Sequence, residues 1–126
     1  MTKANTKYVS LSGLTVGIDV GDRYCNLCVL DEAAEVLEEA RLRTSREALS
    51  KRLAGLEPSL VVIEVGAHSR WLSRLVQELG HTCLVANAYQ ARRLAGERKN
   101  DKLDAKTLAR YGRADPELLH PLTHRG

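Results

Sequence analysis

Short apolar runs and longer amphipathic stretches alternate along this chain. Residues 14–20 (LTVGIDV) form a strand-length run that places Ile18 and its apolar neighbours on one face and Asp19 on the other. Two more strand-length runs, YCNLCVLD and EVLEEARLRT, are joined by the polar residues 32–34, and this pattern predicts an antiparallel hairpin. The first third of the chain is therefore expected to contain three strands.

A helical period follows the hairpin and leads into a fourth strand. Thr44 and Glu47 fit a capping box in front of a leucine stripe, and residues 57–58 (EP) end that helix. Residues 59–65 (SLVVIEV) have the apolar character of a buried strand, in which Glu64 is the only charged residue.

The remainder continues the same alternation. Ser69 is expected to cap an amphipathic helix that ends near Gly80, and TCLVA, residues 82–86, forms a fifth strand. Residues 87–94 are expected to form a short helix with Asn87 as its cap, and the last helix is predicted from about residue 101 to 112.

This order of elements joins an antiparallel hairpin to parallel β-α-β units. It predicts an α/β fold with a mixed five-stranded sheet flanked by helices. With 126 residues, 44% hydrophobic and 28% charged, the chain fits a single core. We expect one domain over 14–114, an N-terminal extension over 1–13, and a loosely ordered tail or the start of a linker over 115–126.

Composition argues against secretion and against a zinc finger. No apolar run approaches the roughly 18 residues that cross a bilayer, and the polar opening MTKANTKYVS is unlike a signal peptide, so a cytoplasmic protein without membrane contact is expected. Cys25 and Cys28 form a C-x-x-C pair, but residues three apart on a strand point to opposite faces, and no second pair follows. Buried free thiols are the predicted state.

Two acids interrupt strands that are expected to be buried. A carboxylate removed from water is costly unless it is paired or binds a metal, so Asp19 and Glu64 are each expected to have a charged partner or a bound cation. If the strands at 14–20 and 59–65 are neighbours, the two side chains meet near one end of the sheet, where a cation would bridge them.

Two further acids open the last helix, in KNDKLDAKTLARYG. Asp101 and Asp104 are three residues apart, so on a helix they differ by about 60° in azimuth and share the first turn, where the macrodipole favours negative charge. The same row continues through Leu108 and Tyr111, which indicates that this face packs on the sheet. A solvated helix with mixed charges is the alternative interpretation.

Carboxylates brought this close would need a counter-charge. Hard divalent cations prefer oxygen ligands, and four acids suit two ions about 4 Å apart, an arrangement used in phosphodiester transfer. The sequence therefore predicts a site for two Mg²⁺ or Mn²⁺ ions, formed by Asp19, Glu64, Asp101 and Asp104.

Positive charge is concentrated beside the two helix aspartates. Residues 92–113 hold eight Lys or Arg side chains and three acidic ones, a local charge of +5 in a chain whose net charge is +3. Phosphate is the natural complement of such a surface. The predicted nucleic-acid-binding residues are Arg92, Arg93, Arg98, Lys99, Lys102 and Lys106.

Three segments together resemble a known family. VGIDVGDRYCNLCVLD, VVIEVGAHSRWL and KNDKLDAKTLARYG resemble the N-terminal domain of the DEDD transposases of bacterial insertion sequences, over about residues 14–122. The resemblance implies a ribonuclease H-like fold similar to RuvC-type Holliday-junction resolvases, with the four acids as a catalytic, metal-binding tetrad. It also implies Mg²⁺-dependent DNA strand cleavage and transfer in the bacterial cytoplasm. Asp22 departs from the family pattern, because relatives often carry lysine there.

The resemblance also implies partners beyond this chain. A C-terminal domain of the family supplies a serine proposed as the attacking nucleophile, and some relatives use a guide RNA encoded by the element. The full-length protein is expected to be a homo-oligomer. The chain is therefore interpreted as the metal-binding half of an enzyme, incomplete by itself.

Two other classes of function remain open. GIDVGDRY is similar to the first phosphate loop of sugar-kinase and actin-like ATPase domains, although no second glycine-rich loop follows. A noncatalytic nucleic-acid-binding or assembly module would pair the acids with neighbouring Arg and Lys side chains. His68, after the Glu64 strand, and Trp71, on a leucine stripe, are interpreted as structural residues.

Overall fold

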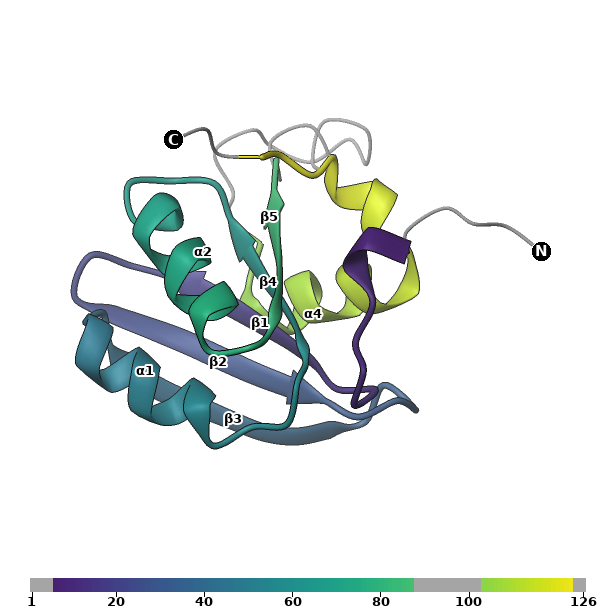
Figure 1. Ribbon diagram of the computed structural model, residues 1–126, viewed down its shortest axis with the longest axis horizontal. Coiled ribbons are helices and arrows are strands. Elements are labelled where there is room, and N and C mark those ends of the chain that lie inside the picture. The colour runs from purple at the N-terminus through teal and green to yellow at the C-terminus, as the bar shows by residue number, and fades with distance from the viewer. Residues whose placement is uncertain (1–5, 88–102, 124–126) are drawn as a thin grey trace.

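A five-stranded sheet forms the centre of the protein (Figure 1). The structure, a computed structural model, describes residues 6–87 and 103–123. The strand order is β3-β2-β1-β4-β5, in which β1, β4 and β5 are parallel and the β1–β2 and β2–β3 pairs are antiparallel. The predicted mixed five-stranded sheet is confirmed. The strands are β1 (Thr15–Val20), β2 (Tyr24–Leu30), β3 (Val36–Arg43), β4 (Leu60–Glu64) and β5 (Thr82–Ala86).

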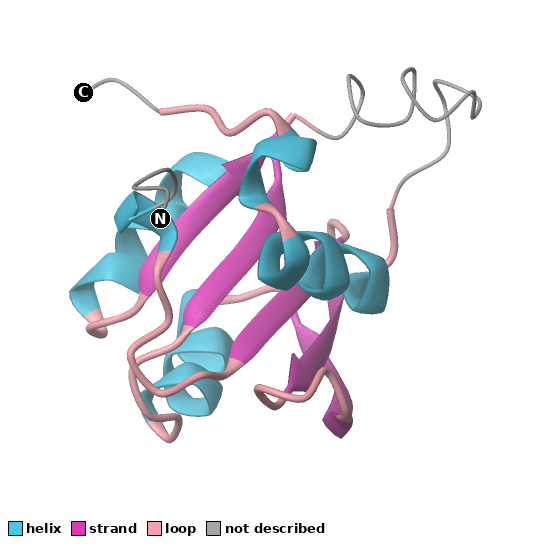
Figure 2. Ribbon diagram, turned by 90° about the vertical axis from the view of Figure 1, so that its right-hand side faces the viewer, coloured by secondary structure: helices cyan, strands magenta, loops and turns pink. Residues whose placement is uncertain are grey.

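Helices cover both faces of this sheet (Figure 2). α1 (Arg46–Ala54) and α2 (Ser69–Glu78) pack on one face, whereas α4 (Ala105–Ala114) lies across β1, β2 and β4 on the other. A short 3₁₀ helix, η1 (Thr6–Tyr8), precedes the sheet. Among residues 6–87 and 103–123, no helix has the length and apolar content to cross a membrane.

The two faces bury different kinds of side chain. The core under α1 and α2 contains Ile18, Ile63, Leu53 and Leu72, all with 0% exposure. The core under α4 is divided into two smaller groups, one around Leu108 and one, called here the small-residue group, formed by Cys28, Ala105 and Ala109 around Leu30. Because side chains alternate along a strand, consecutive residues of each strand contribute to the cores on opposite faces.

The first helix begins one residue later than the capping box predicted. Ser45 is its N-cap, and the Ser45 Oγ accepts a hydrogen bond from the Ala48 N–H at 3.1 Å. The Thr44 hydroxyl instead donates to the Gly21 carbonyl at 2.7 Å, which ties the end of β3 to the turn after β1. The predicted cap is wrong because a tertiary contact takes up the threonine hydroxyl.

The second helix also differs from its predicted start by one residue. Ser69 is the first residue of α2, and His68 occupies the N-cap position. The Ser69 Oγ accepts from the Gly66 N–H and donates to the Gly66 carbonyl, which closes the turn after β4. Gly80 follows the helix with φ of 90°, a left-handed conformation that favours glycine, so the predicted end is confirmed.

The chain after α4 packs against the sheet. The 3₁₀ helix η2 (Pro116–Leu119) buries Leu119 completely, and the Leu122 N–H donates to the Val85 carbonyl at 2.8 Å, beside β5. The expectation of a loosely ordered tail is therefore wrong for residues 115–123, because Leu119 joins the core under α4. The short helix predicted over 87–94 lies, apart from Asn87, outside the described residues.

The two cysteines of the C-x-x-C pair are buried on opposite faces. Cys25 belongs to the core under α1 and α2, and Cys28 contacts the small-residue group under α4. They cannot share one metal ion, and the interpretation as buried thiols is confirmed for this pair.

Candidate metal centre and nucleic-acid interface

The sheet register brings the backbones of two predicted ligands together. Ile18 of β1 pairs with Ile63 of the parallel strand β4. Asp19 and Glu64 each follow one of these residues, so they point to the opposite face, toward the α4 side of the sheet. Adjacent strands lie about 4.8 Å apart, so the prediction that the first and fourth strands are neighbours, with their acids near one end of the sheet, is confirmed.

The two side chains nevertheless line different cavities. Asp19 lines a cavity of about 410 Å³, and Glu64 lines another of about 280 Å³ with Asp22 and His68. Both carboxylates are half-buried, and the Oε1 atom of Glu64 is shielded from solvent. The sheet thus places the acids in one row while their side chains enter neighbouring hollows.

Two glycines let α4 approach the sheet closely. A Cβ atom at Gly17 would lie 1.9 Å from the Ala105 carbonyl oxygen, and one at Gly112 would lie 2.5 Å from a methyl carbon of Val62. The absence of side chains at these two positions allows the helix backbone to rest directly on β1 at Gly17 and on Val62 of β4 at Gly112. This contact sets the start of α4 beside the strand that carries Asp19.

This packing places Asp104 at the same cavity as Asp19. Both residues line the 410 Å³ cavity, together with Asn26, Glu39, Arg41 and Lys106. The two acids are far apart in the sequence and come from different elements. Their convergence at one cavity follows from the position of α4 on β1.

The helix begins later than predicted, and this changes the position of Asp104. α4 starts at Ala105, so Asp104 is its N-cap instead of a first-turn residue. Its Oδ1 accepts a hydrogen bond from the Thr107 N–H at 2.8 Å. This bond, a second one from the Thr107 side chain, and the charges of Lys106 and Arg110 lower the pKa of Asp104, against a smaller opposing effect of burial.

Most of the predicted basic surface lies outside the described residues. Asp101 falls in the undescribed segment 88–102, so its place near the other acids stays a prediction. Lys106 is the one predicted nucleic-acid-binding residue within the described ranges, and it lines the same cavity as Asp19 and Asp104. The remaining predicted nucleic-acid-binding residues all fall in the undescribed segment: Arg92, Arg93, Arg98, Lys99 and Lys102.

The donor chemistry fits a hard cation, but the described residues do not form a closed cage. Within residues 6–87 and 103–123, no three His, Cys, Asp or Glu side chains are grouped so as to hold a metal ion. Mg²⁺ commonly takes only one or two carboxylates, with water and substrate phosphate as its other ligands. Asp19 and Asp104 supply such a pair of oxygen donors at one cavity.

His68 is fixed in orientation beside the Glu64 cavity. Its Nδ1 accepts a hydrogen bond from the Trp71 Nε1–H at 3.0 Å, and its Nε2 lies 3.4 Å from an Asp22 carboxylate oxygen. Because Nδ1 is an acceptor, the neutral ring carries its proton on Nε2. Trp71 itself is half-buried against the core, as its leucine stripe predicted.

Asn26 and Arg41 are site residues that sequence reasoning missed. Both are exposed and share a cross-strand row with Asp19, because Asp19 pairs with Asn26 and Asn26 pairs with Arg41. The alternation in the hairpin indicated polar positions on one face. It did not indicate which hairpin residues stand opposite Asp19, since that depends on the register of two strand pairs.

A family model described as transposase, DEDD_Tnp_IS110, matches residues 16–125. The chain belongs to this transposase family. The resemblance inferred from the three sequence segments is thereby confirmed.

The comparisons with individual proteins add less. No curated protein matches the chain. Among solved structures, the transposase chain is similar to T. thermophilus RuvC in complex with Holliday junction substrate, with 16% identity over 86% of this chain and 99% of that chain and a TM-score of 0.49. At this identity and score, the likeness carries no weight for function.

Proposed function

We propose that this chain is the metal-binding part of a DNA transposase or site-specific recombinase. Asp19, Glu64, Asp101 and Asp104 hold Mg²⁺ or Mn²⁺, and the basic segment around them contacts DNA. The observation that carries this proposal is that Asp19 and Asp104 line one cavity although they are 85 positions apart in the sequence. Membership of a transposase family supports DNA as the substrate.

The roles of the acids follow from their surroundings. Asp104 is held by its role as helix cap, and the same hydrogen bonds lower its pKa below the ordinary value. Asp19 faces the same cavity from the sheet, and Glu64 stands on the neighbouring strand. Two bound divalent ions would stabilise the negative charge that develops on the attacking and leaving oxygens of a phosphodiester.

Basic residues at the cavity provide the counter-charge for a DNA backbone. Lys106 and Arg41 line the same cavity as the two aspartates. Arg92, Arg93, Arg98, Lys99 and Lys102 are proposed to extend this surface. The attacking serine, a guide RNA and further subunits belong to the proposed full assembly.

Divalent-ion linkage tests the metal site directly. A ligand that binds only the folded state adds RT ln(1 + [L]/Kd), so 10 mM Mn²⁺ with a Kd of about 1 mM adds about 1.4 kcal/mol, or about 5 °C in Tm. Thermal melts with Mn²⁺, Mg²⁺ and EDTA should show this shift. The double variant Asp19→Asn with Asp104→Asn should abolish it, and asparagine preserves the N-cap.

A control variant removes a carboxylate charge away from the cavity. Asp31 accepts hydrogen bonds from the Ala33 and Glu35 N–H groups in the hairpin turn, and Asp31→Asn keeps an oxygen acceptor there. This variant should retain the full divalent shift. A wild-type melting temperature that neither Mn²⁺ nor Mg²⁺ changes would instead support a noncatalytic binding module.

Anomalous diffraction from crystals soaked in Mn²⁺ gives the second test. Density beside Asp19 and Asp104 is the expected result. Density confined to the Glu64 and His68 cavity would contradict the proposed pairing of Asp19 with Asp104.

A further inference from the structure

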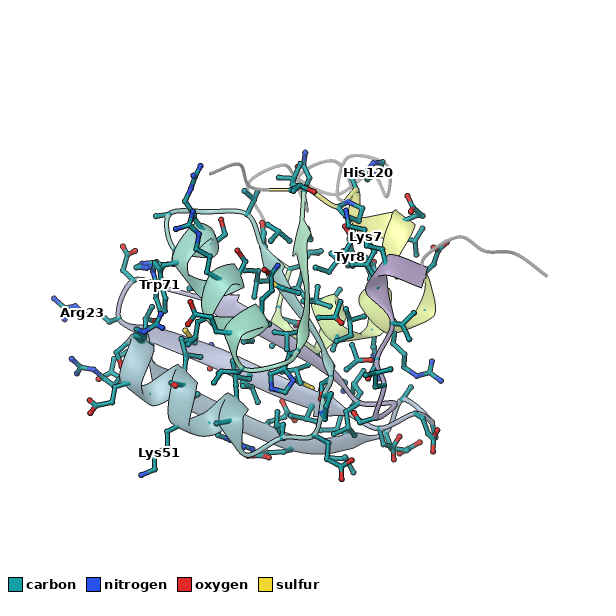
Figure 3. The ribbon with its side chains drawn as sticks, in the orientation of Figure 1. Lys7, Tyr8, Arg23, Lys51, Trp71 and His120 are labelled. Atoms are coloured by element: carbon teal, nitrogen blue, oxygen red, sulfur yellow. The ribbon has the colours of Figure 1, made fainter. Side chains whose placement is uncertain are left out.

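Part of the α4 face of the sheet is left open. α4 lies across β1, β2 and β4, while β3 forms the edge of the sheet. The side chains of Tyr24, Asn26, Arg41 and Arg43 are therefore exposed on this face. Arg23, next to Tyr24, points into solvent at the turn between β1 and β2 (Figure 3).

The register connects this open surface to the acid cavity. Asp19, Asn26 and Arg41 form one row across three strands, and Arg43 pairs with Tyr24 two residues along. With strands about 4.8 Å apart, the Arg41 backbone lies about 10 Å from that of Asp19. At a rise of about 3.4 Å per nucleotide, this separation corresponds to about three nucleotides of a DNA strand.

The two guanidinium groups are held by one aromatic ring. Arg41 lies 4.6 Å and Arg43 lies 5.6 Å from the centre of the Tyr24 ring. Cation–π contacts of this kind restrict the rotamers of long side chains. The arginines therefore lose less conformational freedom when they bind an anion than unrestrained surface arginines would.

The charges of these arginines are available to an outside partner. Among residues 6–87 and 103–123, the salt bridges join other side chains, and Arg41 and Arg43 take part in none. Glu39 lies on the same face and lines the cavity, whereas Glu38 pairs with Arg52 toward α1. Over β2 and β3, the two arginines outnumber the one acid on this face, Glu39, whereas the cavity itself is lined by three acids against Arg41 and Lys106.

We propose that Tyr24, Arg41 and Arg43 form a phosphate clamp that guides a DNA strand across β2 and β3 into the Asp19–Asp104 cavity. Arg41 and Arg43 donate to backbone phosphates, and Tyr24 is a positioning residue. The occupant follows from charge complementarity and from continuity with the acid cavity. This inference rests on the proposed function and assigns it a strand path over β2 and β3, through residues that are not part of the basic segment 92–106.

Salt-dependent DNA binding measures the clamp. Fluorescence anisotropy of a short labelled duplex is recorded between about 0.05 and 0.5 M KCl, with the chain in Mg²⁺ and in EDTA. Each phosphate contact contributes about 0.9 to the slope of log K against log salt, so Arg41→Gln with Arg43→Gln should reduce its magnitude by about 1.8. If wild type and variant bind DNA equally at 1 M salt, this difference in slope corresponds to about 30-fold weaker binding of the variant at 0.15 M salt.

The matched control removes two charges from the other face. Arg46 on α1 and Arg74 on α2 are exposed, and Arg46→Gln with Arg74→Gln should leave the slope unchanged. Tyr24→Ala should weaken binding about 2- to 5-fold, and Tyr24→Phe, which keeps the ring, should restore it. Melts of each variant confirm folding.

The outcomes separate this inference from the metal proposal. Equal slopes for the Arg41/Arg43 and Arg46/Arg74 variants overturn the clamp, whatever the divalent ions do. A slope change that persists in EDTA supports the clamp even where the divalent melting shift is absent, which is the result that overturns the metal site. Tighter binding of a matched RNA duplex would overturn DNA as the occupant.

Discussion

The two faces of the sheet are built on different principles. Under α1 and α2, large aliphatic side chains such as Ile18 and Leu72 interdigitate and keep helices and strands apart. Under α4, Gly17 and Gly112 allow the helix backbone to approach the strands directly. One face stabilises the fold through buried apolar area, and the other uses close backbone contact to bring Asp104 to Asp19.

This difference separates stability from site geometry. A lost methylene under α1 and α2 lowers stability but leaves the acids in place. A methyl group added under α4 moves the helix that carries one of them. Substitutions on the two faces should therefore have comparable costs in folding, but only those on the α4 face should abolish metal binding.

The largest expected loss of stability is on the α1/α2 face. Leu72 is fully buried, and Leu72→Ala should lower the free energy of unfolding by about 2–5 kcal/mol, measured by urea denaturation. The divalent stabilisation should persist, because the cavity lies on the other face. Loss of the metal response in the folded variant would show that the two faces are coupled.

A slightly smaller loss is expected on the α4 face, accompanied by loss of the site. Gly17→Ala adds a Cβ against helix backbone that cannot rotate away, so it should cost about 1–3 kcal/mol or more. Because α4 must move, the Mn²⁺-dependent rise in Tm should disappear. Gly66→Ala is the control, since a Cβ there meets no atom within 4 Å.

The helix cap provides a third, smaller effect. Asp104→Ala removes the acceptor for the Thr107 N–H and should cost about 1 kcal/mol in chemical denaturation, whereas Asp104→Asn should cost only a fraction of that. Equal losses in the two variants would show that charge and not capping stabilises the start of α4.

The same residue predicts a pH dependence. The folded pKa of Asp104 is below its ordinary value of 3.8, so its stabilising contribution is present above about pH 4 and is lost as the pH falls through the lower folded value. The difference in stability between wild type and Asp104→Asn should shrink over that acidic range. A difference that stays constant to low pH would contradict the shift.

The smallest expected effect compares two thiols. Cys28 lies in the small-residue group under α4 and Cys25 in the larger core, so Cys28 should be alkylated a few-fold faster at urea concentrations below the unfolding transition. Burial raises the pKa of Cys28, and because both thiols are buried, both should react slowly in the native protein. Mass spectrometry of pulse-labelled peptides measures the ratio, and equal rates would indicate that the two faces open together.

Local pattern was sufficient for the elements and for the nature of the acids. The alternation in β1 and the apolar run of β4 predicted that Asp19 and Glu64 interrupt buried strands, because both patterns depend only on residues close in the sequence. The leucine stripe of α2 and the opposite orientations of Cys25 and Cys28 followed in the same way. Three segments in combination also predicted the family that the comparison confirms.

The tertiary structure alone decided which of these residues meet. It placed Asp104 at the cap of α4, directed Glu64 and Asp19 into neighbouring cavities, and set Asn26 and Arg41 in the row of Asp19. Periodicity assigns a residue to a face but contains no information about strand register or about how far a helix sinks toward a sheet. Those depend on long-range contacts, here the approach of α4 to the bare backbone at Gly17.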